Sequence, residues 1–169
     1  MLLPFLKVMP LQTNSFFFFN KSATLTLKNL AFLNQLLRKK FIPVFCGDMI
    51  YDPQKQFRIL SGDTISILLA KKLSALRVVF ATDVDGVYSD EKKIGDRKFL
   101  LSSIFRKQLR AVLAGNKNFA ARDTTGELPG KLREISSKPQ KTKVFILNGL
   151  KAKNVYRGLA GKDIGTVIV

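Results

Sequence analysis

The segment RVVFATDVDGVYSD, residues 77–90, decides the fold, because it places three acids and one glycine directly after a short apolar run. An apolar run of this length that is followed by turn residues is typical of a buried β-strand. In an open α/β sheet, ligands bind in the crevice at the carboxyl ends of parallel strands. The segment therefore predicts a strand that ends in a ligand-binding loop.

The sequence on both sides of this segment alternates between helical and strand patterns. Apolar residues recur at helical spacing ahead of the strand FIPVF, and a second apolar helix, which begins after the cap Ser61-Gly62-Asp63, precedes residues 77–80. Further along, we expect helices over residues 99–114, 130–136 and 154–160, and strands over residues 143–147 and 166–169. This alternation predicts an α/β domain with a mainly parallel central sheet that helices cover.

Continuous apolar runs indicate which strands lie at the centre of the sheet, because a strand that is covered on both faces has no polar face. On this basis we expect adjoining central strands to contain Val44, Phe45, Val78, Val79, Phe80, Phe145 and Ile146.

Composition limits the chemistry. The chain has 169 residues, of which 46% are hydrophobic, so it can form one sizeable core, and a single domain over residues 1–169 is expected. A net charge of +17 suits anionic partners such as nucleotides, phosphorylated metabolites, RNA or an anionic membrane surface. Because histidine is absent, chemistry must use Asp, Glu, Lys, Arg or backbone amides.

The sequence argues against specific nucleic-acid binding and against a membrane span. The basic runs lack the interleaved aromatic residues of a stacking platform, so no specific nucleic-acid binding is expected. The apolar run at residues 16–19 is too short to span a membrane and is interpreted as a strand. No signal-peptide pattern is present at the N-terminus, and the single Cys46 is compatible with a reducing cytoplasm, so we expect a cytoplasmic protein.

Four motifs lie at the ends of predicted elements: PVFCGDMIYD, ILSGD, ATDVDGVYSD and DTTGELPGKL. Together with the ending ILNGLKAKNVYRGLAGKDIGTVI, their order and spacing resemble the amino acid kinase superfamily, which shares the fold of aspartate, glutamate and uridylate kinases. Within it, they are most similar to the isopentenyl phosphate kinases, over roughly residues 42–168. The resemblance implies a three-layer αβα sandwich and transfer of phosphate from ATP, with Mg²⁺, to isopentenyl phosphate. The product would be isopentenyl diphosphate, in an alternative mevalonate pathway of isoprenoid biosynthesis.

The resemblance also implies the site residues. A strand end, a glycine that admits close approach and a lysine near a helix start can together hold a nucleotide. The implied ATP-binding residues are Thr82, Asp83, Asp85, Gly86, Val87, Tyr88, Gly126 and Lys131. Asp63 would be catalytic by organising lysines between the two phosphates, and Gly62 would lie on the substrate side. Asp48 is interpreted as a turn residue, with indirect Mg²⁺ binding as the alternative.

Several family features are missing from this chain. It contains no GGS or GGG phosphate loop and no substrate-holding histidine, and Glu127 replaces a usual second glycine. The chain therefore resembles only the C-terminal, nucleotide-binding part of the family, truncated at its N-terminal side, and exposed apolar surface is expected where strands are missing. Two readings stay open. One is a kinase that is weak or inactive alone and is completed by an N-terminal chain, or assembles as a homodimer; the other is a non-catalytic, nucleotide-binding remnant.

Overall fold

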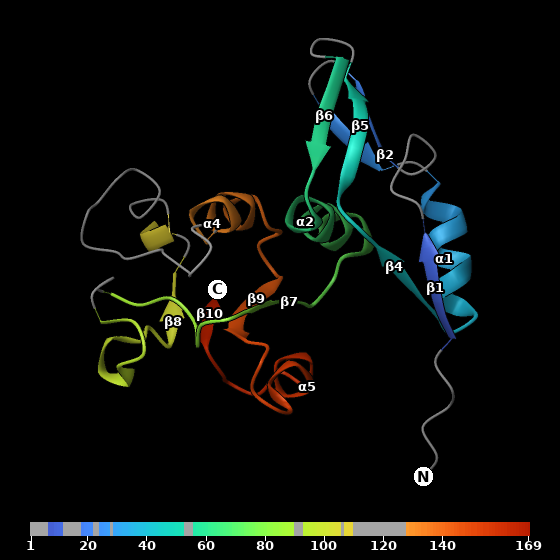
Figure 1. Cartoon of the computed structure of the whole chain (residues 1–169). Coiled ribbons are helices and arrows are strands. Elements are labelled where there is room, and N and C mark those ends of the chain that lie inside the picture. The colour runs from blue at the N-terminus through green and yellow to red at the C-terminus, as the bar shows by residue number, and fades with distance from the viewer. Residues whose placement is uncertain are drawn as a thin grey trace. The chain divides into compact units, whose positions relative to one another are not determined.

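The computed structural model describes residues 7–11, 18–21, 24–27, 29–52, 56–89, 93–105, 107–109 and 128–169 (Figure 1). The chain divides into two compact units, Met1–Lys72 and Leu73–Val169. Each unit is described by itself below.

Unit 1 begins with three strands, β1 (Lys7–Leu11), β2 (Phe18–Lys21) and β3 (Thr24–Leu27). The helix α1 (Leu30–Arg38) and the strand β4 (Phe41–Phe45) follow, then the strands β5 (Asp48–Asp52) and β6 (Gln56–Leu60). The helix α2 (Gly62–Leu73) ends the unit. β1 pairs with β4 in parallel, whereas β2 with β3 and β5 with β6 form antiparallel pairs. The helices predicted before FIPVF and after Ser61 are confirmed.

The parallel pair of β1 and β4 has one apolar face in contact with solvent. Val8 lies opposite Ile42, and Pro10 lies opposite Val44. Val8 is 65% exposed and Val44 is 45% exposed, so these side chains do not belong to a closed core. The exposed apolar surface expected from the missing family strands is therefore present in this unit.

The hairpin of β5 and β6 was not predicted from the sequence. Its register places Met49 opposite Ile59 and Tyr51 opposite Phe57 on one face, which is exposed. Ile50, on the other face, is buried. The period-two alternation that signals such a hairpin is only a few residues long on each side of the turn.

Unit 2 contains the four-stranded sheet, with the strand order β7-β9-β10-β8. Its strands are β7 (Arg77–Thr82), β8 (Ser103–Ile104), β9 (Lys143–Asn148) and β10 (Thr166–Ile168). Its helices are the 3-10 turn η2 (Arg97–Phe99), α4 (Leu128–Ser136) and α5 (Asn154–Leu159). β7 and β9 are parallel, as are β8 and β10, and only β9 with β10 is antiparallel. The structure confirms the strands predicted to begin at residues 77, 143 and 166. It also confirms the helices predicted over residues 130–136 and 154–160.

Helices cover both faces of this sheet, which gives the three-layer α/β arrangement (Figure 1). On one face, Phe145, Leu147 and Val167 form a buried cluster, and α5 approaches so closely that a Cβ at Gly158 would lie 2.6 Å from the Leu147 side chain. On the other face, the Lys131 ammonium of α4 lies 5.7 Å from the centre of the Phe80 ring. α4 and α5 therefore lie on opposite sides of the strands.

One sequence-based expectation is wrong in the described residues. The helix expected over residues 99–114 is not formed at its start: Phe99 ends η2, Leu100 forms a β-bridge with Tyr88, and residues 103–104 form β8. The backbone explains this, because Leu101 N–H donates to the Val87 carbonyl at 2.9 Å instead of to a helical partner. Residues 107–109 are helical, and residues 110–114 lie outside the described residues.

The prediction of adjoining central strands is confirmed for β7 and β9, which pair in parallel. Val44 and Phe45 lie in β4 of unit 1, where β4 pairs with β1, and their place beside β7 and β9 stays a prediction. A continuous apolar run indicates a strand without indicating which strand it pairs with.

The turn into β10 gives a stability prediction. Gly165 has φ +68°, and a Cβ there would overlap the Ile146 carbonyl oxygen and lie 2.9 Å from that of Asp85. We expect Gly165→Ala to lower the free energy of unfolding by about 2 kcal/mol or more. Gly95→Ala is the matched control, because Gly95 also has positive φ but has no described atom within 4 Å of the added Cβ. Denaturant unfolding measures both variants, and equal losses would contradict the steric argument.

Candidate functional site

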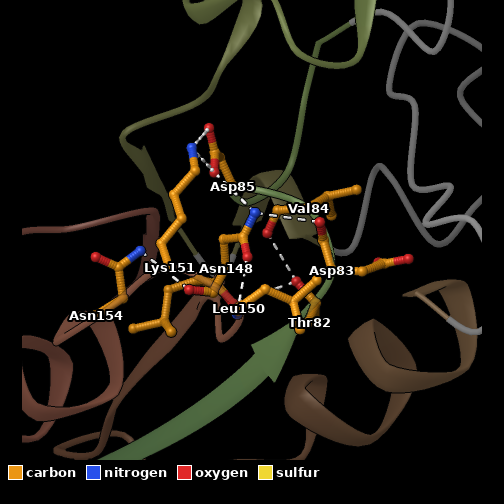
Figure 2. Close-up of polar contacts among 9 residues, drawn as sticks. Thr82, Asp83, Val84, Asp85, Asn148, Leu150, Lys151 and Asn154 are labelled. Carbon is orange, nitrogen blue, oxygen red and sulfur yellow. Dashed lines mark hydrogen bonds and ion pairs between the residues drawn. The ribbon is translucent and has the colours of Figure 1, made fainter.

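The carboxyl ends of β7 and β9 come together through the side-chain amide of Asn148 (Figure 2). Its Nδ2 donates to the Asp83 carbonyl at 3.2 Å and to Asp85 Oδ1 at 3.1 Å. Its Oδ1 accepts from the Leu150 N–H at 3.0 Å. A single amide therefore links the loop after β7 to the loop after β9.

Asp85 forms an ion pair with Lys151, which lies in the loop after β9. The two charged groups approach to 2.6 Å, and the Asp85 side chain is 20% exposed while that of Lys151 is 52% exposed. The hydrogen bond from Lys151 lowers the pKa of Asp85 below its ordinary value, and the Asn148 hydrogen bond and the charge of Arg97 act in the same direction, against the opposing effect of burial. Asp85 is thus held ionised and directed toward the chain's own residues.

The next part of the segment is packed inside the unit. Gly86 leaves room for Thr166, since a Cβ there would lie 2.5 Å from Thr166 Oγ1. The Val87 N–H donates to Thr166 Oγ1 at 2.8 Å, and Thr166 Oγ1 donates to the Leu101 carbonyl at 2.6 Å. Val87 is 0% exposed and Tyr88 is 2% exposed. These residues support the loop from within.

Thr82 and Asp83, which are half-buried, lie where β7 ends. Thr82 Oγ1 donates to the Val84 carbonyl at 2.9 Å, and the Thr82 carbonyl accepts from the Gly149 N–H at 2.8 Å. Figure 2 shows the Asp83 carboxylate directed away from the Asp85–Lys151 pair. Lys131 of α4 is half-buried and lies over the ring of Phe80. Phe80 precedes Thr82 by two residues in β7.

The remaining residues named from the sequence lie elsewhere. Gly126 lies outside the described residues. Gly62 and Asp63 begin α2 in unit 1, where the Thr64 N–H donates to Ser61 Oγ at 3.1 Å, so the predicted cap is confirmed. A Cβ at Gly62 would meet no described heavy atom within 4 Å.

Sequence reasoning missed the residues that hold the loop. Asn148, Lys151 and Thr166 lie in the C-terminal stretch that carried part of the family resemblance, but no role was assigned to them. The available signals were an Asn-Gly pair directly after a predicted strand and a Gly-Thr pair directly before the last one. Neither signal indicates a partner more than sixty residues away in the sequence.

Neither a metal cluster nor a membrane-spanning helix is present in the described residues. Within the described ranges, no group of three or more Cys, Asp or Glu side chains is arranged to hold a metal ion. In the same part of the chain, no helix combines the length and the hydropathy that crossing a bilayer requires.

Parallel strands with carboxylates and an amide at their carboxyl ends, and helices on both faces, define an α/β ligand-binding domain. The sequence profile of the amino acid kinase family matches residues 3–148, and the chain belongs to this family.

Relatives with assigned names include isopentenyl phosphate kinases. That of Methanocaldococcus jannaschii is 35% identical over 136 residues, which are 80% of this chain and 49% of the relative. That of Thermoplasma acidophilum is 32% identical, over 76% of this chain and 50% of the relative. Glutamate 5-kinase of Enterococcus faecalis is 28% identical, over 80% of this chain and 51% of the relative. The chain therefore spans about half the length of the curated relatives that it matches.

A solved structure supports the fold. An X-ray structure of isopentenyl phosphate kinase matches with a TM-score of 0.66 and 24% sequence identity, and the match covers 97% of this chain and 60% of that one. At this identity the match establishes the fold alone.

The Asp85–Lys151 pair gives a pH-dependent prediction. Because the folded-state pKa of Asp85 is lowered from 3.8, the pair stabilises fully above that value and is lost as the pH falls through the folded-state pKa. We expect Lys151→Met to cost about 0.5–1 kcal/mol at neutral pH, a value that allows for solvent screening of the exposed lysine. Lys162→Met is the control for loss of one charge, because Lys162 is exposed. Denaturant unfolding across acid pH tests this, and a deficit that persists after Asp85 is protonated would contradict it.

Proposed function

We propose that this chain is the nucleotide-binding part of an ATP-dependent phosphotransferase whose acceptor is isopentenyl phosphate or a similar small phosphorylated molecule. With isopentenyl phosphate, the product is isopentenyl diphosphate. The observation that carries the proposal is the loop after β7, which is fixed from within by Asn148 and Thr166 while the Asp83 carboxylate is directed away from the Asp85–Lys151 pair. The names of the isopentenyl phosphate kinase relatives support this choice of acceptor over uridylate or glutamate.

In this proposal, the loop after β7 and the helix α4 each hold a different part of ATP. Thr82 and Asp83 contact the nucleotide at the end of β7, and Lys131 on the same face of the sheet attracts the phosphates. Gly86, Val87 and Tyr88 shape the loop from its buried side, and Asp85 holds it through Lys151. Gly126 is assigned to the same nucleotide site from the family resemblance. Mg²⁺ bound with ATP would neutralise part of the charge on its phosphates.

The acceptor side depends on unit 1. Gly62, at the start of α2, leaves open space in which a substrate phosphate can approach the backbone. Asp63 follows it in the first turn of the helix, and a carboxylate at a phosphoryl-transfer site must be compensated by cations. Asp63 therefore acts by holding lysines between the two phosphates, and those lysines come from a part of the family that this chain lacks.

The alternative is a non-catalytic nucleotide-binding protein or one half of a split kinase. Its support is the exposed apolar face of β1 and β4, formed by Val8, Ile42 and Val44, together with the half-length match to the relatives. A complementary N-terminal chain would cover such a face and supply the phosphate loop, and a second copy is the other partner for it. Both proposals set the protein in the cytoplasm.

Weak binding of Mg-ATP by the chain alone is the first test of this function. We expect the double variant Asp83→Ala with Lys131→Ala to bind Mg-ATP at least about tenfold more weakly, because it loses one contact to the nucleotide and one charge-assisted contact to phosphate. Lys162→Ala serves as the control for loss of one surface cation and should bind as the unmodified chain does. Calorimetric titration measures all three, and unchanged binding in the double variant would reject the assigned site.

Turnover of isopentenyl phosphate is the second test. Loss of a single preorganised donor to the transferring group costs about 3 kcal/mol, or a hundredfold or more in rate. The chain alone should therefore turn over isopentenyl phosphate at least that much more slowly than the Methanocaldococcus jannaschii relative. Adding the N-terminal half of that relative should restore part of the rate. Rates like the relative's from the chain alone would refute the expectation that a second chain is required.

A further inference from the structure

A pocket lies beside the Asp85–Lys151 pair, on the face of the sheet that α5 covers. Its volume is about 420 Å³, within the range of small-molecule sites. Five segments contribute to it: the loop after β7, η2 with the residues after it, the loop after β9, α5, and the turn into β10. The lining residues are Asp85, Arg97, Leu100, Ser102, Lys151, Asn154, Arg157, Ile164 and Gly165.

The charge of this pocket is positive. Three cationic side chains, those of Arg97, Lys151 and Arg157, face one carboxylate, that of Asp85. Lys151 neutralises Asp85 through the ion pair at 2.6 Å, which leaves the two arginines as excess positive charge. Within the described part of the chain, Arg157 has no ion-pair partner, and Arg97 acts on Asp85 only through its charge. A guanidinium group presents paired N–H donors that match phosphate or carboxylate oxygens.

The inner surface of the pocket is mixed. Asn154 is buried at 9% exposure, and its Nδ2 is fixed by donating to the Asn148 carbonyl at 3.0 Å. Leu100 and Ile164 supply apolar surface, and both are only half-buried by the rest of the unit. Excess guanidinium charge beside apolar side chains suits an anion that carries a small organic group.

This pocket is separate from the proposed nucleotide site. Val79 and Leu147 face α5, whereas Phe80, the next residue along β7, faces α4 and lies under the Lys131 ammonium. The pocket borders α5, so the sheet itself separates it from Lys131. Neither Asp83 nor Lys131 lines it.

We propose that this pocket is a second anion-binding site, which takes the phosphoryl group of a small phosphomonoester on Arg97 and Arg157 and its organic group on Leu100 and Ile164. The assignment does not rest on the proposed kinase function, because it uses none of the residues assigned to catalysis or to the acceptor, and it uses Asp85 only as the partner of Lys151.

The test is a titration of the full chain with inorganic phosphate and with butyl phosphate, followed by NMR at the Leu100 and Ile164 methyl groups. We expect saturable shifts at both methyl groups and tighter binding of butyl phosphate than of inorganic phosphate, because only the former has a group to bury against them. The double variant Arg97→Gln with Arg157→Gln should weaken butyl phosphate binding at least about tenfold. The double variant Lys141→Gln with Lys162→Gln removes the same charge from exposed positions outside the pocket and should not weaken it.

A Lys131→Ala variant separates this proposal from the proposed function. This variant should show the same methyl shifts with butyl phosphate and should bind Mg-ATP more weakly. Unchanged methyl shifts together with unchanged Mg-ATP affinity would contradict the proposed function and still support the pocket assignment. Shifts that disappear in Lys131→Ala but persist in the arginine variant would overturn the proposal, because they would place the bound anion at the α4 face. Equal weakening by the two double variants would also overturn it, since net charge alone would then explain binding.

Discussion

The buried hydroxyl of Thr166 is the contact on which the candidate site depends. It accepts from the Val87 N–H and donates to the Leu101 carbonyl, and Thr166 is 0% exposed, so water cannot replace either partner. Leaving a buried backbone group without a partner costs about 1–3 kcal/mol. The contact is geometrically possible only because Gly86 has no Cβ where Thr166 packs. A residue of the last strand therefore fixes the backbone of the loop after β7, and the order of the sheet, with β10 between β9 and β8, brings the two together.

A second set of contacts gives the acids of that loop different roles. Asn148 and Lys151 hold the Asp85 side chain toward the loop after β9, while Asp83 contributes only its backbone carbonyl to Asn148 and directs its carboxylate elsewhere (Figure 2). Two carboxylates that are two residues apart are thus directed differently. An extended strand would direct side chains i and i+2 to the same face, so the separation reflects the bend at residues 83–86, beyond the end of β7.

Local patterns in the sequence were sufficient for the helices α1, α2, α4 and α5 and for the strands β4, β7, β9 and β10, because each has its own apolar period or run. They failed where a distant partner decides the structure. The apolar spacing of residues 99–104 is compatible with a helix. However, Leu100 forms a β-bridge with Tyr88, and residues 103–104 form the strand β8, which pairs with β10. The loop of residues 82–88 was found from its own acids and glycine, whereas its supports Asn148, Lys151 and Thr166 could not be paired with it, because nothing in a single sequence reports contacts across sixty or more residues.

The ion pair between Asp85 and Lys151 also explains how a basic protein can place acids where phosphates are expected to bind. An unpaired carboxylate at this edge of the sheet would repel a nucleotide on one face and any anion in the α5 pocket on the other. Lys151 lowers the pKa of Asp85 and cancels its charge locally, so the carboxylate can hold two loops together without making the edge negative. The excess charge is then carried by side chains on the two faces, Lys131 at α4 and the two arginines at the α5 pocket. Because the sheet separates these cations, we propose a different anion for each face, and the contacts of Asp85, Asn148 and Thr166 fix the loop at the edge between them.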